Sequence, residues 1–163
     1  MGMRFFSDNA AIVCPPVMEA LQAANQVDTA YDGDALSRDL DRAFSALFET
    51  DVAVIWMSTG TSANALALSL FCPPYGGIFC HDEAHVMGDE CGAVELQTHG
   101  ARLMGCAAPG AKLTAAILAE RANQIRPDVH RIQPHAVTIT NATEYGLIYA
   151  PSDVAEIGDF CRE

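Results

Sequence analysis

The stretch VAVIWMSTGTSANALALSL, residues 52–70, joins three patterns within one short span. An apolar, β-branched run comes first, and it predicts a strand over Val52–Met57. A glycine surrounded by hydroxyl residues follows, and apolar residues at helical spacing then predict a helix over Ser62–Leu70. A strand that turns directly into a helix is the building unit of α/β proteins, so this stretch decides the fold class.

The same alternation continues along the chain. Further strands are predicted over Gly77–His81, Ala101–Cys106 and Ala136–Thr140. Further helices are predicted over about Asp89–Leu96, Thr114–Asn123 and Ser152–Arg162. This rhythm indicates an α/β fold with three layers, in which helices cover both faces of a mostly parallel central sheet.

The first fifty residues show no such alternation. A helix is predicted over Pro15–Gln26, and a turn at Asp32-Gly33-Asp34 precedes a second helix with an apolar stripe. We therefore expect an N-terminal helical arm over 1–50 and a sheet-containing domain over 51–163. The sequence stops after a helix, where this architecture calls for another strand, so we expect that domain to be truncated.

Composition excludes several classes of function. The chain has 163 residues, half of them hydrophobic, and a formal charge of −12. The hydrophobic content argues against disorder, and the acidic charge argues against a nucleic-acid partner. No apolar run reaches the length of a membrane span, so no membrane partner is expected. Six scattered cysteines form no paired motif, which favours a reducing, cytoplasmic location.

The turn around Gly60 favours an anion. Ligands of open α/β sheets bind beyond the carboxyl ends of the strands, where helix N-termini present backbone N–H groups. Gly60 lets the backbone approach a phosphate closely, and Ser58, Thr59, Thr61 and Ser62 add hydroxyl donors. The pattern matches neither the dinucleotide-binding fingerprint nor the P-loop. The alternative is an ordinary Ser/Thr helix cap.

The segment FCHDEAHVMGDECGA, residues 79–93, gathers histidines and acids just past a predicted strand. One interpretation is a metal site on His81 and His85, although Glu83 is misplaced for a zinc-binding helix. A second is a cofactor ring stacked on an imidazole and tuned by a carboxylate. A third is a polar loop in which Asp89 caps the next helix.

Several motifs together resemble one family. In chain order they are FFSDNAA, AYDGD, STGTSAN, CHDEAHVMGDECGA, PGAKLT and TITNATEYG. This series resembles the low-specificity threonine aldolases and β-eliminating lyases, which use pyridoxal 5′-phosphate on the aspartate-aminotransferase fold. The resemblance implies a fold type I large domain that cleaves β-hydroxy amino acids to glycine and an aldehyde. It also implies an amino-acid substrate and a homo-oligomer.

The resemblance assigns roles to five residues around the cofactor. Gly60 and Thr61 match the turn that binds the phosphate. His85 matches the histidine that stacks on the pyridine ring and handles a proton, and Glu90 matches an acidic residue that follows it. Thr143, in the NATEYG turn, matches a position that lines the cofactor site.

Substrate and lysine positions follow from the same resemblance. Ser7 matches a serine that binds the substrate carboxylate, and Tyr31 matches a tyrosine in a turn near the site. The family binds its cofactor covalently through a lysine, but the single lysine here, Lys112, matches an exposed surface loop. Covalent attachment of the cofactor is therefore not expected in this chain.

These expectations define a main hypothesis and its rivals. The main hypothesis is an incomplete pyridoxal-phosphate-binding large domain over 51–163, truncated before the lysine and inactive alone. Its partner would then be a second copy or the missing C-terminal part, as in a split enzyme. The rivals are a non-catalytic binding or assembly module with the same fold and, as the weakest, a metal-dependent hydrolase built on His81 and His85.

Overall fold

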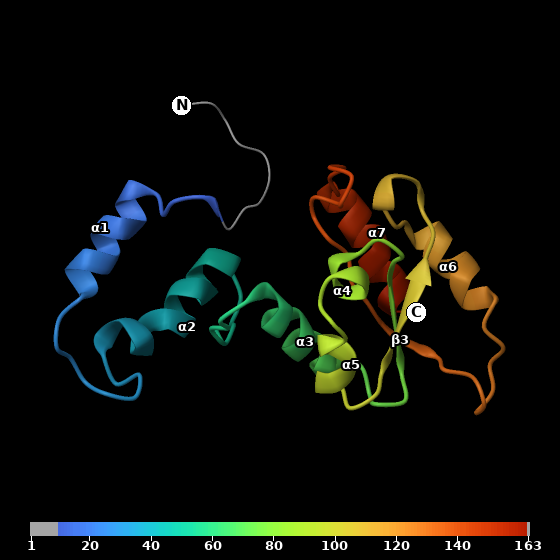
Figure 1. Ribbon diagram of the computed structural model, residues 1–163, viewed down its shortest axis with the longest axis horizontal. Coiled ribbons are helices and arrows are strands. Elements are labelled where there is room, and N and C mark those ends of the chain that lie inside the picture. Colours follow the sequence, from blue (N-terminus) through green and yellow to red (C-terminus); the bar gives the residue numbers. More distant parts are fainter. Residues whose placement is uncertain (1–9, 163) are drawn as a thin grey trace. The chain divides into compact units, whose positions relative to one another are not determined.

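A computed structural model describes residues 10–162 of the chain. It divides into two compact units, Met1–Ile55 and Trp56–Glu163 (Figure 1). The described helices include none that is long and apolar enough to cross a membrane.

The described part of the first unit includes the α-helices α1 (Pro15–Ala24) and α2 (Ala35–Phe48). Two prolines start α1, where their missing N–H groups are not needed, and the helix ends at Ala24 instead of Gln26. Asp34 caps α2, because its carboxylate accepts from Ser37 N at 2.9 Å. The predicted Asp32-Gly33-Asp34 turn therefore leads directly into the second helix.

The strand predicted over Val52–Met57 is wrong, since residues 51–57 form no strand. Side chains of α2 take the backbone groups that a neighbouring strand would use. Val52 N donates to Ser45 Oγ at 3.0 Å, and Val54 N donates to Asp41 Oδ1 at 2.8 Å. β-branched composition favours a strand only where a partner strand is available.

The second unit is built on a parallel sheet with the strand order β2-β1-β3. The strands are β1 (Gly77–His81), β2 (Arg102–Cys106) and β3 (Pro134–Val137). The first matches its prediction, the second starts one residue late, and the third ends at Val137 instead of Thr140. The central strand β1 is buried along its whole length.

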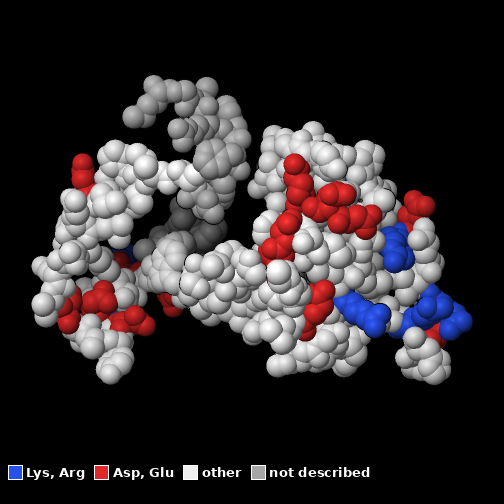
Figure 2. Space-filling model, in the orientation of Figure 1, with Lys and Arg blue, Asp and Glu red and all other residues white. Residues whose placement is uncertain are grey.

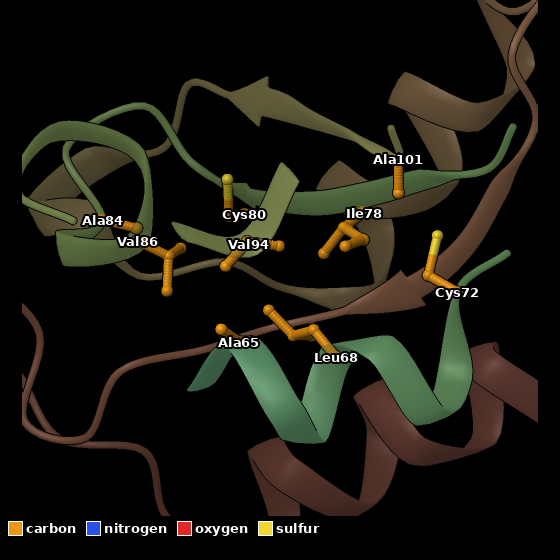
Figure 3. Close-up of a cluster of buried hydrophobic side chains, with 9 residues drawn as sticks. All are labelled: Ala65, Leu68, Cys72, Ile78, Cys80, Ala84, Val86, Val94 and Ala101. Atoms are coloured by element: carbon orange, nitrogen blue, oxygen red, sulfur yellow. The ribbon is translucent and has the colours of Figure 1, made fainter. Parts of the chain in front are cut away.

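Alternating side chains of β1 face two separate clusters of buried residues. Ile78 and Cys80 pack against α3 (Gly60–Phe71) and α5 (Ala93–Gln97), and Figure 3 shows Leu68 of α3 directed toward Val94 and Ile78. Phe79 points to the other face, where it packs with residues of α6 (Ala115–Asn123) and α7 (Pro151–Arg162). Helices therefore cover both faces, which confirms the predicted α/β fold.

The helix predicted over about Asp89–Leu96 begins only at Ala93, as α5, and a separate short helix precedes it. That helix is α4 (His85–Gly88), and a turn in which Cys91 and Gly92 have φ values of 51° and 73° separates it from α5. Left-handed residues cannot continue an α-helix, so the chain reverses here. Asp89 follows α4, and the residue before α5 is Gly92, so Asp89 does not cap the next helix.

Candidate cofactor and catalytic site

The first turn of α3 presents two backbone donors. The Thr59 hydroxyl accepts from Ser62 N at 3.1 Å, and the Thr59 carbonyl accepts from Ala63 N at 3.1 Å. Within residues 10–162 the N–H groups of Gly60 and Thr61 have no recorded acceptor. A Cβ at Gly60 would meet no atom within 4 Å, so there is open space beside this residue. Free donors at the positive end of a helix, facing open space, fit a phosphate.

The structure confirms the helix-cap interpretation of this turn, and the phosphate interpretation stays a prediction. The hydroxyls of Thr59 and Ser62 lie 3.0 Å apart and serve the helix cap. The donors that remain for an anion are the backbone N–H groups of the next two residues. The cap is compatible with an anion at this turn, because it fixes the helix end that presents the free donors, and the phosphate contact stays a prediction.

A buried carboxylate connects α3 to the histidine segment. Glu90 Oε1 accepts from Asn64 Nδ2 at 2.7 Å and lies 2.9 Å from His85 Nδ1. The side chain of Glu90 is 1% exposed, whereas that of His85 is 58% exposed. The link places the imidazole of His85 beside the N-terminal half of α3, the part that also carries Gly60 and Thr61.

This contact sets the protonation of the imidazole. A carboxylate only accepts hydrogen bonds, so Nδ1 of His85 carries the proton that it donates to Glu90. No described residue is hydrogen-bonded to Nε2, which therefore offers its lone pair outward. The hydrogen bond to Glu90 raises the pKa of His85, the charges of Glu90, Asp89 and Glu144 raise it further, and desolvation opposes them.

Glu90→Gln is expected to lower the pKa of His85 toward its ordinary value of about 6.5, because the main cause of the upward shift is removed. The folded pKa of His85 is raised, so its stabilising contribution is complete below about pH 6.5 and is lost as pH rises through the folded pKa. Glu90→Gln should make the free energy of unfolding depend less steeply on pH. An NMR titration of the imidazole and urea unfolding at several pH values measure both effects.

The control is Glu83→Gln, because Glu83 is an exposed acid of the same segment that does not act on His85. It should leave the titration of His85 unchanged. Equal shifts in the two variants would contradict a specific role for Glu90.

The NATEYG turn contacts the same segment from another side. Glu144 Oε1 accepts from the backbone N–H of His85 at 3.0 Å, at the start of α4. The Thr143 hydroxyl donates to Gly110 O at 2.8 Å and accepts from Leu147 N at 3.1 Å. These bonds give Thr143 a structural role in the turn, and its predicted contact with a cofactor stays a prediction.

His81 has its ring nitrogens engaged by the backbone. Glu83 N donates to His81 Nδ1 at 3.0 Å, and His81 Nε2 lies 3.0 Å from Ala108 O. A metal centre on His81 and His85 would have to break these contacts. No group of three or more metal-ligating side chains is found among residues 10–162.

Lys112 is less exposed than predicted. Its Nζ lies 2.6 Å from Asp153 Oδ2 and 5.5 Å from the centre of the Tyr149 ring, and its side chain is 28% exposed. Asp153 Oδ2 also accepts from Ala150 N at 2.8 Å, at the start of α7. The prediction of an exposed lysine is therefore wrong, because Lys112 is only partly exposed and an ion pair joins it to α7.

The two predicted substrate residues belong to the N-terminal part of the chain. Tyr31 belongs to the first unit, where it is fully exposed in a turn with a φ of 57°. Ser7 lies outside the described residues. Their roles toward a substrate stay predictions.

The surroundings of His85 are acidic. Figure 2 shows Asp and Glu side chains crowded near α4 on the visible face of the second unit, whereas Lys and Arg lie toward α6. A general positive field would therefore not attract an anion here, and any attraction would have to come locally from the helix end of α3. A hollow of about 770 Å³ lies elsewhere, at residues 127–135 and Tyr75, and shares no residue with the site.

Comparisons with known proteins show which family the chain belongs to. The family model for "Beta-eliminating lyase" matches residues 4–163. The chain belongs to the beta-eliminating lyase family. It is 40% identical over 163 residues to a low specificity L-threonine aldolase of Pseudomonas sp. (strain NCIMB 10558), covering 99% of this chain and 47% of the relative.

Two further beta-eliminating lyase relatives support the same assignment. The low specificity L-threonine aldolase of Pseudomonas aeruginosa is 38% identical over 161 residues, covering 98% of this chain and 46% of the relative. A solved threonine aldolase of Leishmania major superposes with a TM-score of 0.82 at 26% identity, covering 91% of this chain and 43% of that one. The chain thus spans about half the length of the curated relatives it matches.

Sequence reasoning missed two residues of the site in this family member. Asn64 was quoted only as part of the STGTSAN motif, yet it lies one helical turn after Gly60 and faces Glu90. That i, i+4 spacing was the available signal. Glu144 gave no signal, because its contact with His85 spans 59 residues of sequence.

Cys91→Gly is expected to stabilise the second unit by up to about 1 kcal/mol. Cys91 is exposed and has a left-handed φ of 51°, a conformation that glycine adopts without a Cβ penalty. Urea unfolding measures the change. The matched variant is Cys161→Gly, which places glycine inside the right-handed helix α7 and should destabilise by roughly 0.5–1 kcal/mol. The same sign in both variants would contradict strain at Cys91.

Proposed function

We propose that this chain supplies the phosphate-binding turn and the proton-handling imidazole of a pyridoxal-phosphate lyase. The reaction is cleavage of a threonine-type β-hydroxy amino acid into glycine and an aldehyde. One observation carries the proposal: the hydrogen-bonded link from Asn64 through Glu90 to His85 holds an imidazole beside a helix end with two free N–H donors. The names of the aldolase relatives support the choice of reaction.

The residues present fit the cofactor, and each has a defined task. Pyridoxal 5′-phosphate, when bound, supplies an electron sink for the breaking Cα–Cβ bond. Gly60 and Thr61 would hold its phosphate through their N–H groups. Nε2 of His85 would receive the proton of the substrate's β-hydroxyl, since Nδ1 is already protonated toward Glu90. Glu90 would stabilise the imidazolium that results.

Other parts of the site belong to the same proposal. We expect Ser7 and Tyr31 to contact the substrate and Thr143 to lie near the cofactor. Lys112 is paired with Asp153, which supports the view that it does not bind the cofactor covalently. The lysine that does so should belong to the part of the relatives that this chain does not span.

The reaction is tested by supplying the missing part in trans. The chain is mixed with the C-terminal half of the P. aeruginosa relative and pyridoxal 5′-phosphate, and glycine released from L-threonine is measured. Release is expected from the mixture and from neither part alone. Release that is unaffected when the chain is omitted, or when His85→Asn replaces it, would contradict the proposal.

Assembly and location complete the proposed function. We expect the protein to work as a homo-oligomer or together with the C-terminal part, and to reside in the cytoplasm. All six cysteines are free in the structure, and three of them are buried, which supports a reducing compartment.

A further inference from the structure

We infer that Asn64 is a positioning residue of this site: its amide holds Glu90 in the one orientation that fixes the Nδ1 proton of His85. Asn64 Nδ2 lies 2.7 Å from Glu90 Oε1, the same oxygen that lies 2.9 Å from His85 Nδ1. Both donors therefore converge on one carboxylate oxygen. The catalytic meaning of this inference rests on the proposed function. The hydrogen-bond geometry that supports the inference is independent of that function.

The burial of Glu90 makes the Asn64 contact decisive. The Glu90 side chain is 1% exposed, and its Oε2 has no hydrogen-bond partner among the described residues. The amide of Asn64 and the imidazole of His85 are thus the recorded donors to a buried carboxylate. A buried carboxylate that loses one of two donors is poorly satisfied and turns toward other partners or water.

The backbone at Glu90 supports the same conclusion. The two residues that follow Glu90, Cys91 and Gly92, are both left-handed, so the chain turns sharply and α5 begins. This turn carries Glu90 inward to α3, but a glutamate side chain still has several rotamers. Contacts with other side chains therefore select the rotamer, and Asn64 is the α3 residue that donates a hydrogen bond to it.

One helix then sets both halves of the site. The first turn of α3 carries the free N–H groups of Gly60 and Thr61, and Asn64 lies one turn further along. Movement of α3 would shift the phosphate-binding donors and the carboxylate anchor together. Asn64 acts only through Glu90, so it positions His85 without itself handling a proton.

Histidine NMR tests this role without any cofactor. Nitrogen chemical shifts of the imidazole distinguish the Nδ1–H form from the Nε2–H form. In the unaltered chain above its pKa, His85 should be held as the Nδ1–H form. Asn64→Leu, which keeps the size of the side chain and removes the donor, should convert His85 to a mixture of both forms. The pKa of His85 should fall at the same time, although Asp89 and Glu144 still act on it.

Matched variants separate positioning from a general structural effect. Asn123→Leu, at the exposed end of α6, should leave the His85 signals unchanged. In a Glu90→Gln background, Asn64→Leu should cause no further change in the His85 signals, because Asn64 acts on His85 only through the carboxylate of Glu90. If Asn64→Leu unfolds, Asn64→Asp is used in its place. Asn64→Asp places a second carboxylate against Glu90, so His85 should again become a mixture of the Nδ1–H and Nε2–H forms.

Two results would overturn the inference. One is an unchanged Nδ1–H form of His85 in folded Asn64→Leu or Asn64→Asp. The other is an effect of Asn64→Leu that persists in full in the Glu90→Gln background. The NMR measurements are made without a ligand, so their outcome does not depend on whether the chain binds a cofactor. The inference about Asn64 and the proposed function can therefore be contradicted separately.

Discussion

Phe79→Ala is expected to destabilise the second unit by about 3–5 kcal/mol, the range for removing a fully buried aromatic side chain. Phe79 is 0% exposed at the centre of β1 and packs with Leu118 of α6 and Ile157 of α7. Its removal leaves a cavity between the sheet and both helices. A loss of this size is a large fraction of the stability of a small domain, so much of the variant should be unfolded at 25 °C.

Urea unfolding with far-ultraviolet circular dichroism measures this loss. The control is Phe71→Ala, because Phe71 at the end of α3 is 69% exposed. This control should change the free energy of unfolding by less than about 0.5 kcal/mol. Similar losses in the two variants would mean that Phe79 is not the centre of the sheet–helix core.

Sequence patterns predicted the central layer well for a physical reason. β1 is a short buried strand flanked by partners on both sides, so local propensity and tertiary context agree. Val52–Met57 has a similar composition, but Ser45 and Asp41 of α2 take its backbone donors. The helix predicted over about 89–96 begins late, at Ala93, because residues 89–92 form a turn in which Cys91 is left-handed, and cysteine gives no sequence signal for that conformation.

The candidate site was predicted only in part. The glycine turn and His85 stood out because helix ends and histidine clusters have recognisable patterns. The hydrogen bonds that unite them join Asn64 to Glu90 across 26 residues and His85 to Glu144 across 59. Contacts of that range depend on how α3 and the NATEYG turn pack around β1, which a local pattern does not encode.

The second large effect is expected from Gly60→Pro. Proline is tolerated at the first position of a helix, and Thr59 before it has the extended conformation that a following proline requires, with φ −145° and ψ 158°. The substitution removes one of the two free N–H groups and leaves the helix intact. A hydrogen bond to a charged group contributes about 1.5–3 kcal/mol, so phosphate-dependent affinity should fall by roughly 10- to 100-fold.

α6 provides a closely matched control. Thr114 caps it in the same way, with φ −130° and ψ 159° and a hydroxyl that accepts from Ile117 N. Ala115→Pro therefore makes the same change at the start of a helix that carries none of the proposed site. Ala115→Pro should have the same free energy of unfolding as Gly60→Pro and the same affinity for the phosphate ligand as the unaltered chain.

Calorimetric titration of these three proteins with pyridoxamine 5′-phosphate tests the central claim most directly. This ligand has no aldehyde, so Lys112 cannot capture it covalently. We predict saturable binding to the unaltered chain and to Ala115→Pro, with affinity at least about tenfold weaker for Gly60→Pro, and no such difference for pyridoxamine without phosphate. Equal affinity of Gly60→Pro and Ala115→Pro, or binding that instead depends on Tyr75 and His135 of the 770 Å³ hollow, would contradict a phosphate site at the start of α3.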